Sequence, residues 1–145
     1  MEPTSPTTGV PVRHVLIVLA CDDVVRAKTF YVSVFGWNVI VDFPVYVELA
    51  VPTGLRVGLY ARTEFERNTR ESSAPRPPKG TTACELYLRV DDVGAAYARC
   101  LAAGARSLSA PAPRTWGDEA GYVADPDGNV VAVSRPPDED GSVPG

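Results

Sequence analysis

An internal repeat constrains the possible folds of this chain more than any other feature. An Asp-Asp pair followed by valine occurs at 22–24 and again at 91–93, and a Pro-x-Gly turn occurs at 52–54 and again at 126–128. The same order of predicted elements lies between the markers in both halves. Modules of this size are too small to bury a stable core alone, so we expect the two to pack together as one domain.

The residue pattern predicts a strand, a helix and three short strands in each half. A leucine- and valine-rich run at 14–21 indicates a buried strand, and Asp22 or Asp23 is a typical N-cap for a helix that ends before Gly36. Asp91 or Asp92 begins the second helix, which should end at Ala103. The other strands are predicted near 37–41, 45–51, 56–62, 84–90, 106–109, 121–124 and 130–135.

These elements predict an α+β fold, with two tandem βαβββ modules forming a curved mixed sheet around a central groove. The predicted boundaries are a disordered tail at 1–12, one domain at 13–135 with modules at 13–62 and 83–135, a linker at 63–82, and a disordered acidic tail at 136–145. The linker and the tails are assigned because they are polar and rich in proline or serine.

Composition excludes several classes of function. The net charge of -4 gives no general basic footprint for nucleic acid. No apolar run approaches the roughly 18 residues of a membrane span, and the first residues lack the order of a signal peptide. Three cysteines without CxxC spacing are typical of reduced thiols, so we expect a cytoplasmic protein.

The fold pattern resembles the vicinal oxygen chelate superfamily, which includes glyoxalase I, extradiol dioxygenases and bleomycin-resistance proteins. The resemblance is carried by Asp23, Phe30–Tyr31 and Phe35–Trp37 in the first module, and by Glu85–Leu86, Val90–Val93, Ala95–Tyr97, Ala103–Ala105, Trp116–Gly117 and Asp125–Asn129 in the second. It covers about 13–135, and its last part, Trp-Gly followed by Asp-Pro-Asp-Gly-Asn, is the most specific.

The resemblance places the superfamily's metal-ligand positions on four residues, Leu16, Gly58, Glu85 and Ala132. Of these only Glu85 carries a donor atom suited to a divalent ion, and one carboxylate does not hold a metal against water. We therefore predict no metal and no other cofactor. A shifted site built from His14, Glu48 and Glu85 is the alternative, but we favour a His14 that is satisfied by solvent or backbone.

Strand alternation then predicts which side chains line the groove, because successive side chains point to opposite faces. If Leu16 and Glu85 face the groove, so do the residues at even spacing from them and their counterparts on neighbouring strands. The predicted ligand-binding set is His14, Leu16, Tyr46, Arg56, Gly58, Tyr60, Tyr87, Arg89, Tyr122 and Ala132, with Glu48 and Glu85 among them.

The tyrosines suit a flat organic ligand, since each offers a stacking surface and a polar tip. Glu48 and Glu85 favour a cationic group on that ligand, unless Arg56 and Arg89 neutralise them as cross-strand pairs. Trp116 lies in the loop that helps to wall the drug groove in bleomycin-resistance proteins; it either contacts ligand or plugs the end of the sheet.

Three functional hypotheses follow. Resemblance to the metal-free bleomycin-resistance-like branch implies a homodimer that sequesters a small aromatic or amphipathic metabolite or antibiotic without turnover. A metal-free isomerase, cyclase or epimerase with Glu85 or Glu48 as general base is the second, and a metal-dependent glyoxalase-like lyase or dioxygenase is a weaker variant of it. The third is a non-catalytic partner module in a larger complex.

Overall fold

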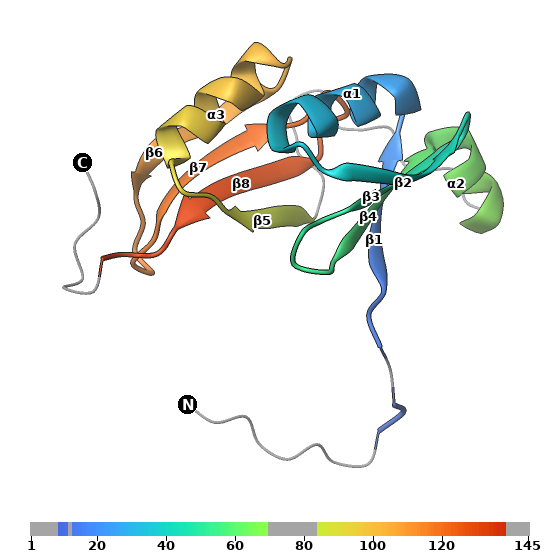
Figure 1. The fold of residues 1–145 in the computed structure, drawn as a ribbon, viewed down its shortest axis with the longest axis horizontal. Helices are drawn as coiled ribbons and strands as arrows, with labels where there is room; N and C mark the ends of the chain where they lie inside the picture. The colour runs from blue at the N-terminus through green and yellow to red at the C-terminus, as the bar shows by residue number, and fades with distance from the viewer. Residues whose placement is uncertain (1–8, 12, 70–83, 139–145) are drawn as a thin grey trace.

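The computed structural model describes residues 9–11, 13–69 and 84–138 of the 145-residue chain. Its two modules repeat one plan (Figure 1). The first module consists of β1 (Leu16–Cys21), α1 (Val24–Phe35), β2 (Asn38–Phe43), β3 (Tyr46–Ala50) and β4 (Arg56–Ala61), followed by α2 (Arg62–Thr69). The second consists of β5 (Glu85–Arg89), α3 (Val93–Ala102), β6 (Arg106–Pro113), β7 (Glu119–Ala124) and β8 (Val130–Arg135).

Each module forms its own four-stranded mixed sheet. The strand orders are β1-β4-β3-β2 and β5-β8-β7-β6, so the same topology occurs twice. β1 and β4 run parallel, as do β5 and β8, while the remaining neighbours are antiparallel. α1 and α3 lie side by side over the same side of the two sheets (Figure 1). The predicted α+β architecture of two tandem modules is confirmed.

The helix boundaries follow from capping residues that the sequence makes visible. The Asp23 carboxylate accepts the Arg26 backbone N–H at 3.0 Å, and Asp92 accepts the Ala95 N–H at 2.9 Å. Each bond satisfies one of the N–H groups that a helix start leaves unpaired. Gly36 ends α1 at φ 67°, a left-handed conformation that costs glycine little.

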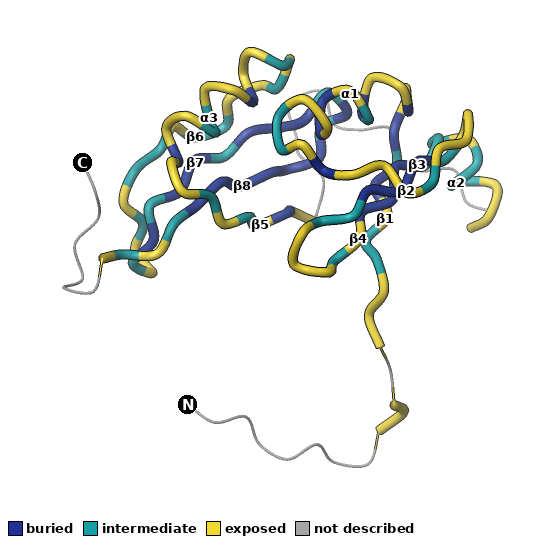
Figure 2. The backbone as a smooth tube through the Cα atoms, in the orientation of Figure 1, coloured by how far each residue is buried: buried dark blue, intermediate teal, exposed yellow. Residues whose placement is uncertain are grey.

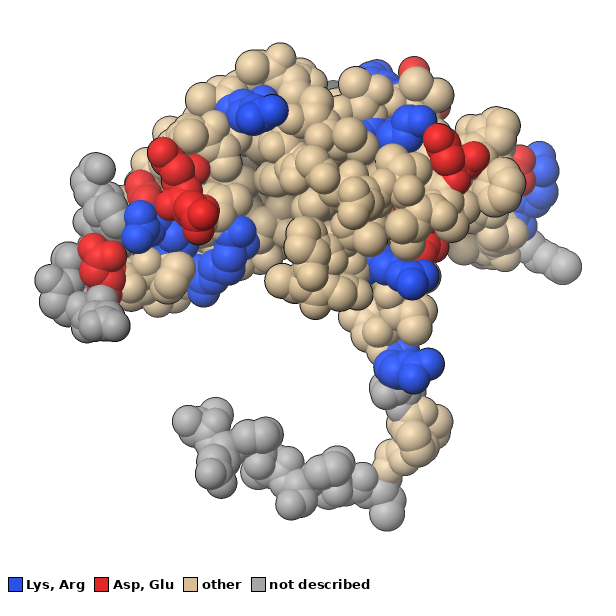
Figure 3. All heavy atoms as spheres, in the orientation of Figure 1, with Lys and Arg blue, Asp and Glu red and all other residues tan. Residues whose placement is uncertain are grey.

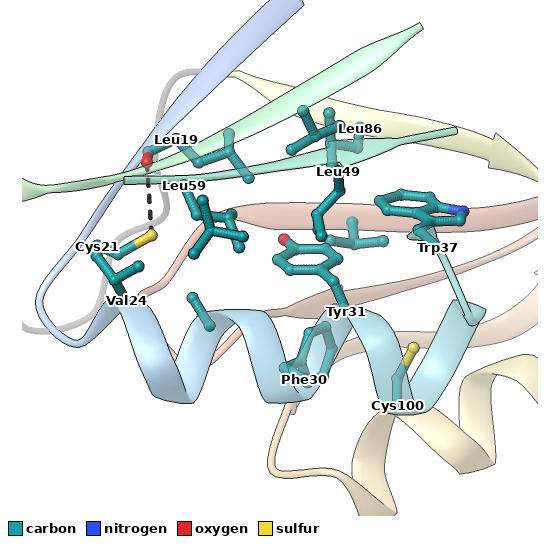
Figure 4. Close-up of a cluster of buried hydrophobic side chains, with 14 of the residues drawn as sticks. Leu19, Cys21, Val24, Phe30, Tyr31, Trp37, Leu49, Leu59, Leu86 and Cys100 are labelled. Carbon is teal, nitrogen blue, oxygen red and sulfur yellow. Dashed lines mark hydrogen bonds between the residues drawn. The ribbon is translucent and has the colours of Figure 1, made fainter. Parts of the chain in front are cut away.

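The core lies between the helices and the sheets. Tyr31 of α1 stacks on Trp37 with ring centroids 5.7 Å apart, and the Tyr31 ring points toward Leu49 of the first sheet (Figure 4). The inner residues of β3, β4, β7 and β8 are buried, whereas the outer surfaces of the helices are exposed (Figure 2). The predicted apolar, helix-facing side of the strands is therefore confirmed.

The turn at 125–129, which we name the clasp turn, joins the two modules. Asp127 is fully buried and accepts hydrogen bonds from the Asp22 backbone N–H at 2.8 Å and from Arg26 Nη2 at 2.9 Å. Asp125 accepts the Tyr31 hydroxyl at 2.6 Å. Burial, followed by the charge of Asp125, raises the pKa of Tyr31, so this tyrosine acts as a hydrogen donor. The most specific sequence motif thus has an inter-module role.

Part of the predicted linker is folded. Residues 62–69 form α2, which packs on β4 and β1, so the segment predicted as a linker at 63–82 begins with a helix. Arg62 anchors the helix to Asp22 at 2.7 Å, and Glu64 pairs with Arg67 one turn later. The remainder of the linker, 70–83, lies outside the described residues.

The predicted tails are described only where they adjoin the domain. Residues 9–11 are exposed, and at the other end Arg135 pairs with Asp138 at 3.5 Å. The remaining tail residues lie outside the described part of the chain. None of the helices within 9–11, 13–69 and 84–138 combines the length and apolar character needed to cross a bilayer.

Candidate functional site

Each sheet has an open face on the side opposite α1 and α3. Strand register confirms the predicted alternation: Leu16 pairs with Arg56, and Glu48 with Gly58, in the first sheet. Tyr46 pairs with Tyr60 in the same sheet. In the second sheet Ala132 lies between Tyr87 and Tyr122, while Glu85 pairs with Val130 and Arg89 with Ser134. The predicted residues that lie in strands therefore share the faces assigned to them, whereas His14 lies before β1.

A tyrosine, a carboxylate and an arginine form a closed cluster on the first open face. The Tyr46 hydroxyl donates to Glu48 Oε1 at 2.7 Å, and Arg56 Nη1 donates to Glu48 Oε2 at 3.0 Å. Burial and this bond raise the pKa of Tyr46 to about 12, so the hydroxyl stays protonated. Both oxygens of the buried Glu48 carboxylate are engaged, which makes the group a poor candidate for a general base.

Tyr46 also occupies the space beside one predicted metal-ligand position. A Cβ atom on Gly58 would lie 2.7 Å from the Tyr46 hydroxyl oxygen and 3.0 Å from Leu16 Cδ1. Both distances are below ordinary van der Waals contact, so the Tyr46 side chain can lie over β4 at this point because residue 58 is a glycine. The space that a ligating side chain at this position would need is filled.

Tyr60 is held at the end of the first open face. Its ring meets that of Tyr46 edge-on with centroids 5.6 Å apart, and Asn68 of α2 donates to its hydroxyl at 2.9 Å. Asn68 lies in the segment expected to be a linker, so its contact with the face was not predicted. The first open face therefore has its polar groups largely satisfied from within the module.

The second open face carries a similar cluster with different connections. Tyr87 donates its hydroxyl to Asp118 Oδ2 at 2.6 Å, and Arg89 Nη1 donates to the same oxygen at 2.7 Å. Trp116 Nε1 donates to the Tyr87 hydroxyl at 2.9 Å. The hydrogen bond from Tyr87, together with the hydrogen bond and the charge of Arg89, lowers the pKa of Asp118 below its usual value, which keeps the carboxylate ionised.

The alternative in which Arg89 neutralises a glutamate across strands does not hold in this arrangement. Arg89 pairs with Asp118 and not with Glu85, which lies at the opposite end of β5. Because a strand rises about 3.3 Å per residue, four residues separate the two side chains by about 13 Å. The β6–β7 loop brings Asp118 close instead, and no periodicity in the strands could have placed it there. In the sequence, the one indication of this role was that Asp118 follows Trp116 by two residues, in the loop that was predicted to border the groove.

Tyr122 lies at the centre of the second open face. Arg114 stacks over its ring at 5.1 Å and is fixed by donating to the Ser109 hydroxyl at 2.9 Å and to the Ala120 carbonyl at 2.8 Å. Burial, then the nearby Glu85 charge, raises the pKa of Tyr122. Arg114 was not among the predicted site residues, because its role depends on the folded loop.

Two polar groups on this face are free to meet a ligand. Within the described residues, neither the Glu85 carboxylate nor the Tyr122 hydroxyl makes a hydrogen bond or an ion pair. Trp116 is 57% exposed and Tyr87 is 38% exposed, so their rings are accessible. Ala132, by contrast, is fully buried between the two tyrosines and forms the floor beneath them. Direct contact of a ligand with Ala132, as predicted, does not fit this burial.

The four positions at which the resemblance places metal ligands do not carry a set of side chains that suits a divalent ion. Leu16, Gly58 and Ala132 carry no donor atoms. His14 lies before β1, is exposed, and is hydrogen-bonded through Nε2 to the backbone carbonyl of Leu16, two residues along the chain, at 3.1 Å. Across the described ranges, no group of three histidine, cysteine or acidic side chains is placed to ligate an ion.

Charged side chains gather toward the two ends of the molecule in the view of Figure 3. The middle of that view, between α3 and the β3–β4 turn, is largely uncharged. In this view the charged groups at the two ends are thus separated by uncharged surface where the modules meet.

Comparison with known proteins agrees with this architecture. The model of the Glyoxalase/Bleomycin resistance protein/Dioxygenase superfamily matches residues 12–133. An uncharacterised protein of Mycobacterium bovis is 29% identical over 121 residues, which cover 81% of this chain and 80% of that protein.

Two solved structures show the same fold. A glyoxalase-related enzyme from Fulvimarina pelagi has a TM-score of 0.75 at 24% identity, over 92% of this chain and 97% of its own. A lactoylglutathione lyase from Agrobacterium tumefaciens has a TM-score of 0.63 at 23% identity, over 86% and 93%. Identities this low establish the shared fold and leave activity open. Because the family model spans most of the residues and both modules, the chain belongs to the Glyoxalase/Bleomycin resistance protein/Dioxygenase superfamily.

Proposed function

We propose that this protein binds and sequesters a small aromatic or amphipathic compound, such as a metabolite or an antibiotic, without using a metal. The second open face is the binding surface. The observation that carries the proposal is the fixed aromatic platform of Tyr87, Trp116 and Tyr122, in which two rings are accessible and one hydroxyl is free. Resemblance to the bleomycin-resistance-like branch supports a homodimer, and the odd number of cysteines without CxxC spacing supports a cytoplasmic location.

The platform is organised before any ligand arrives. Tyr87 is held by Asp118 and Trp116, and Tyr122 is held beneath Arg114. Rings that are already ordered lose little side-chain entropy on binding, so more of the contact energy appears as affinity. Flat ligands then stack on the rings, and the Tyr122 hydroxyl orients them.

The experiment uses the two tryptophans as its readout. Trp37 is buried at 7% exposure and Trp116 is 57% exposed, so a ligand on the platform should alter Trp116 emission alone. The probes are planar aromatic compounds of matched size and different charge, for example 9-aminoacridine, carbazole and 1-naphthoate. We expect saturable quenching that disappears in Trp116→Phe and weakens about tenfold in Tyr87→Ala.

The same titration includes controls that contradict the proposal if they fail. Quenching that persists in Trp116→Phe would place the ligand elsewhere. Conversion of a bound probe into product would show an enzyme and not a sequestering protein. Elemental analysis of protein purified without a metal-affinity tag completes the test, because one tightly bound ion per chain would contradict metal independence.

A second candidate function is a metal-free isomerase, cyclase or epimerase with Glu85 as general base. It is favoured by one observation, the Glu85 carboxylate beside Tyr122 with no partner among the described residues. A ligand that covers this carboxylate would raise its basicity by removing water. The discriminating variant is Glu85→Gln, which should retain binding and lose turnover. Loss of both together would support an anchoring role instead.

A further inference from the structure

A pocket lies at the seam between the two modules, next to the aromatic platform. Its volume is about 540 Å³, and it is lined by residues 17–20 of β1, by 84–86 at the start of β5, and by 129–130 at the start of β8. We name it the seam pocket. Its volume falls within the range of roughly 300–1,000 Å³ that holds small organic ligands.

The pocket exists because the two sheets are joined elsewhere. β1 and β5 are each the edge strand of their own sheet, and each pairs on one side only within the described residues. The modules are connected through the clasp turn and through the helices, where Arg99 Nε donates to the Ser33 carbonyl at 3.1 Å. These contacts hold the sheet edges near each other without a hydrogen-bond ladder, and the space between them remains open.

The chemistry of the lining is mainly aliphatic. Ile17, Val18, Leu19 and Leu86 contribute branched apolar side chains, which favour the burial of hydrocarbon. The Asn129 amide is already committed, because its Nδ2 donates to Asp125 in the clasp turn. The pocket therefore offers apolar surface to a ligand and little side-chain hydrogen bonding.

Glu85 is the exception, and it connects the pocket with the platform. It is the one Asp, Glu, Lys or Arg residue in the described lining, and it also lies close enough to Tyr122 for its charge to disfavour ionisation of that hydroxyl. An unpaired carboxylate at the border of an apolar pocket complements an ammonium group that carries an apolar chain.

We infer that the seam pocket binds the aliphatic part of an amine-bearing ligand, with the ammonium group held by Glu85 and any aromatic part lying on the platform. This inference rests on the proposed binding function and specifies its ligand class as a cationic amphiphile. A carboxylic acid of the same length should be rejected, because it would place a second negative charge beside Glu85.

The probes are n-alkylamines from hexylamine to decylamine and the matching n-alkanoates, measured by isothermal titration calorimetry below their micelle concentrations. Glu85→Gln removes the charge, and Glu119→Gln is its control, since Glu119 begins β7 and does not line the pocket. Val18→Trp fills the pocket. Val39→Trp is its control, since Val39 on the far edge strand is 38% exposed and Val18 is 37% exposed.

Amines should bind with an affinity that rises about threefold for each methylene, and alkanoates should bind weakly at every length. Glu85→Gln should weaken amine binding about fivefold, the range of an accessible ion pair, while Glu119→Gln leaves it unchanged. Val18→Trp should abolish the dependence on chain length, and Val39→Trp should preserve it.

The inference is overturned if amines and alkanoates bind alike, if affinity is independent of chain length, or if Val18→Trp behaves as Val39→Trp does. The failures of the two proposals can be told apart. If aromatic probes quench Trp116 with the same affinity in Val18→Trp as in the unmodified protein, the platform proposal holds and the seam pocket is not part of the site. If alkylamine binding depends on chain length and is unchanged in Trp116→Phe and Tyr87→Ala, the seam pocket binds ligand and the platform proposal fails.

Discussion

The two open faces are built on the same strand topology, but they leave different groups available. In the first module Glu48 comes from a central strand, and its two oxygens separately accept Tyr46 and Arg56. In the second module Asp118 comes from a loop, and one oxygen accepts both Tyr87 and Arg89. Trp116 and Tyr122 extend the second face, whereas α2 restrains the end of the first.

The difference suggests a division of roles between the two repeats, in which the first face stabilises the fold and the second face binds ligand. Polar groups satisfied within a sheet, such as those around Glu48, rigidify the module and offer little to a ligand. Accessible rings and unpaired groups, such as Trp116 and Glu85, are the ones that a ligand can engage. We therefore expect substitutions in the first face to change folding stability, and the equivalent substitutions in the second to change binding.

The clasp turn should give the largest effect, because it sets the position of one face relative to the other. Asp127→Ala removes the acceptor of the Asp22 N–H and of Arg26, and should lower the free energy of unfolding by about 3 kcal/mol. Urea denaturation followed by circular dichroism measures this change in the free energy of unfolding. Asp127→Asn should cost less, since it keeps one amide oxygen as an acceptor. A loss below about 0.5 kcal/mol for the alanine variant would show that the modules dock by other contacts.

Removing the carboxylate of the first face should come next. Glu48→Ala leaves the Tyr46 hydroxyl and Arg56 without their acceptor, and we expect a loss of about 2 kcal/mol in unfolding free energy. Arg56 is more than half exposed and can turn to water, which limits the cost. Binding of aromatic probes to the folded variant should be unchanged. A protein that keeps full stability but loses binding would reverse the roles assigned to the two faces.

A matched pair of tyrosine substitutions sharpens the comparison. Tyr87→Ala should weaken aromatic probe binding about tenfold, equivalent to about 1.4 kcal/mol, because it removes a stacking ring and releases Trp116. Tyr46→Ala should destabilise the fold and leave the affinity within about twofold. Calorimetric titration, at a temperature where both variants are folded, measures the two affinities for comparison. Equal losses of affinity would mean that the ligand spans both faces.

The second face should respond to acid through Asp118. Its pKa is lowered in the folded protein, so its contribution is fully present above the ordinary value of 3.8 and is lost as pH falls through the lowered folded value. Protonation releases Tyr87 and Arg89 and therefore frees Trp116. Trp116 emission should change below about pH 4, and Asp118→Asn should remove that transition. An identical acid transition in the asparagine variant would assign it to another group.

The smallest effect should come from the restraint on Tyr60. Asn68→Ala removes one exposed hydrogen bond from α2, which should cost about 0.5 kcal/mol. Freed from this bond, the Tyr60 ring should become more mobile in NMR relaxation while the fold is retained. If aromatic probes then bind the first face as well, the satisfaction of its polar groups was what had kept it inactive.

Much of the architecture was predictable because it depends on short-range rules. The Asp-Asp pairs marked both helix starts, Gly36 marked a helix end, and alternation assigned Tyr46, Tyr60, Tyr87 and Tyr122 to the open faces. These features depend on residue type and spacing along one element, which a sequence displays directly.

What only the tertiary structure decided involves contacts between elements distant in sequence. The pairing of Arg89 with Asp118, the restraint of Tyr60 by α2 and the docking of Asp127 beside β1 and α1 all join separate segments. The seam pocket arises from how far apart two sheet edges are held. Strand periodicity gives the direction of a side chain but not its partner, because the partner depends on how loops and modules pack in three dimensions.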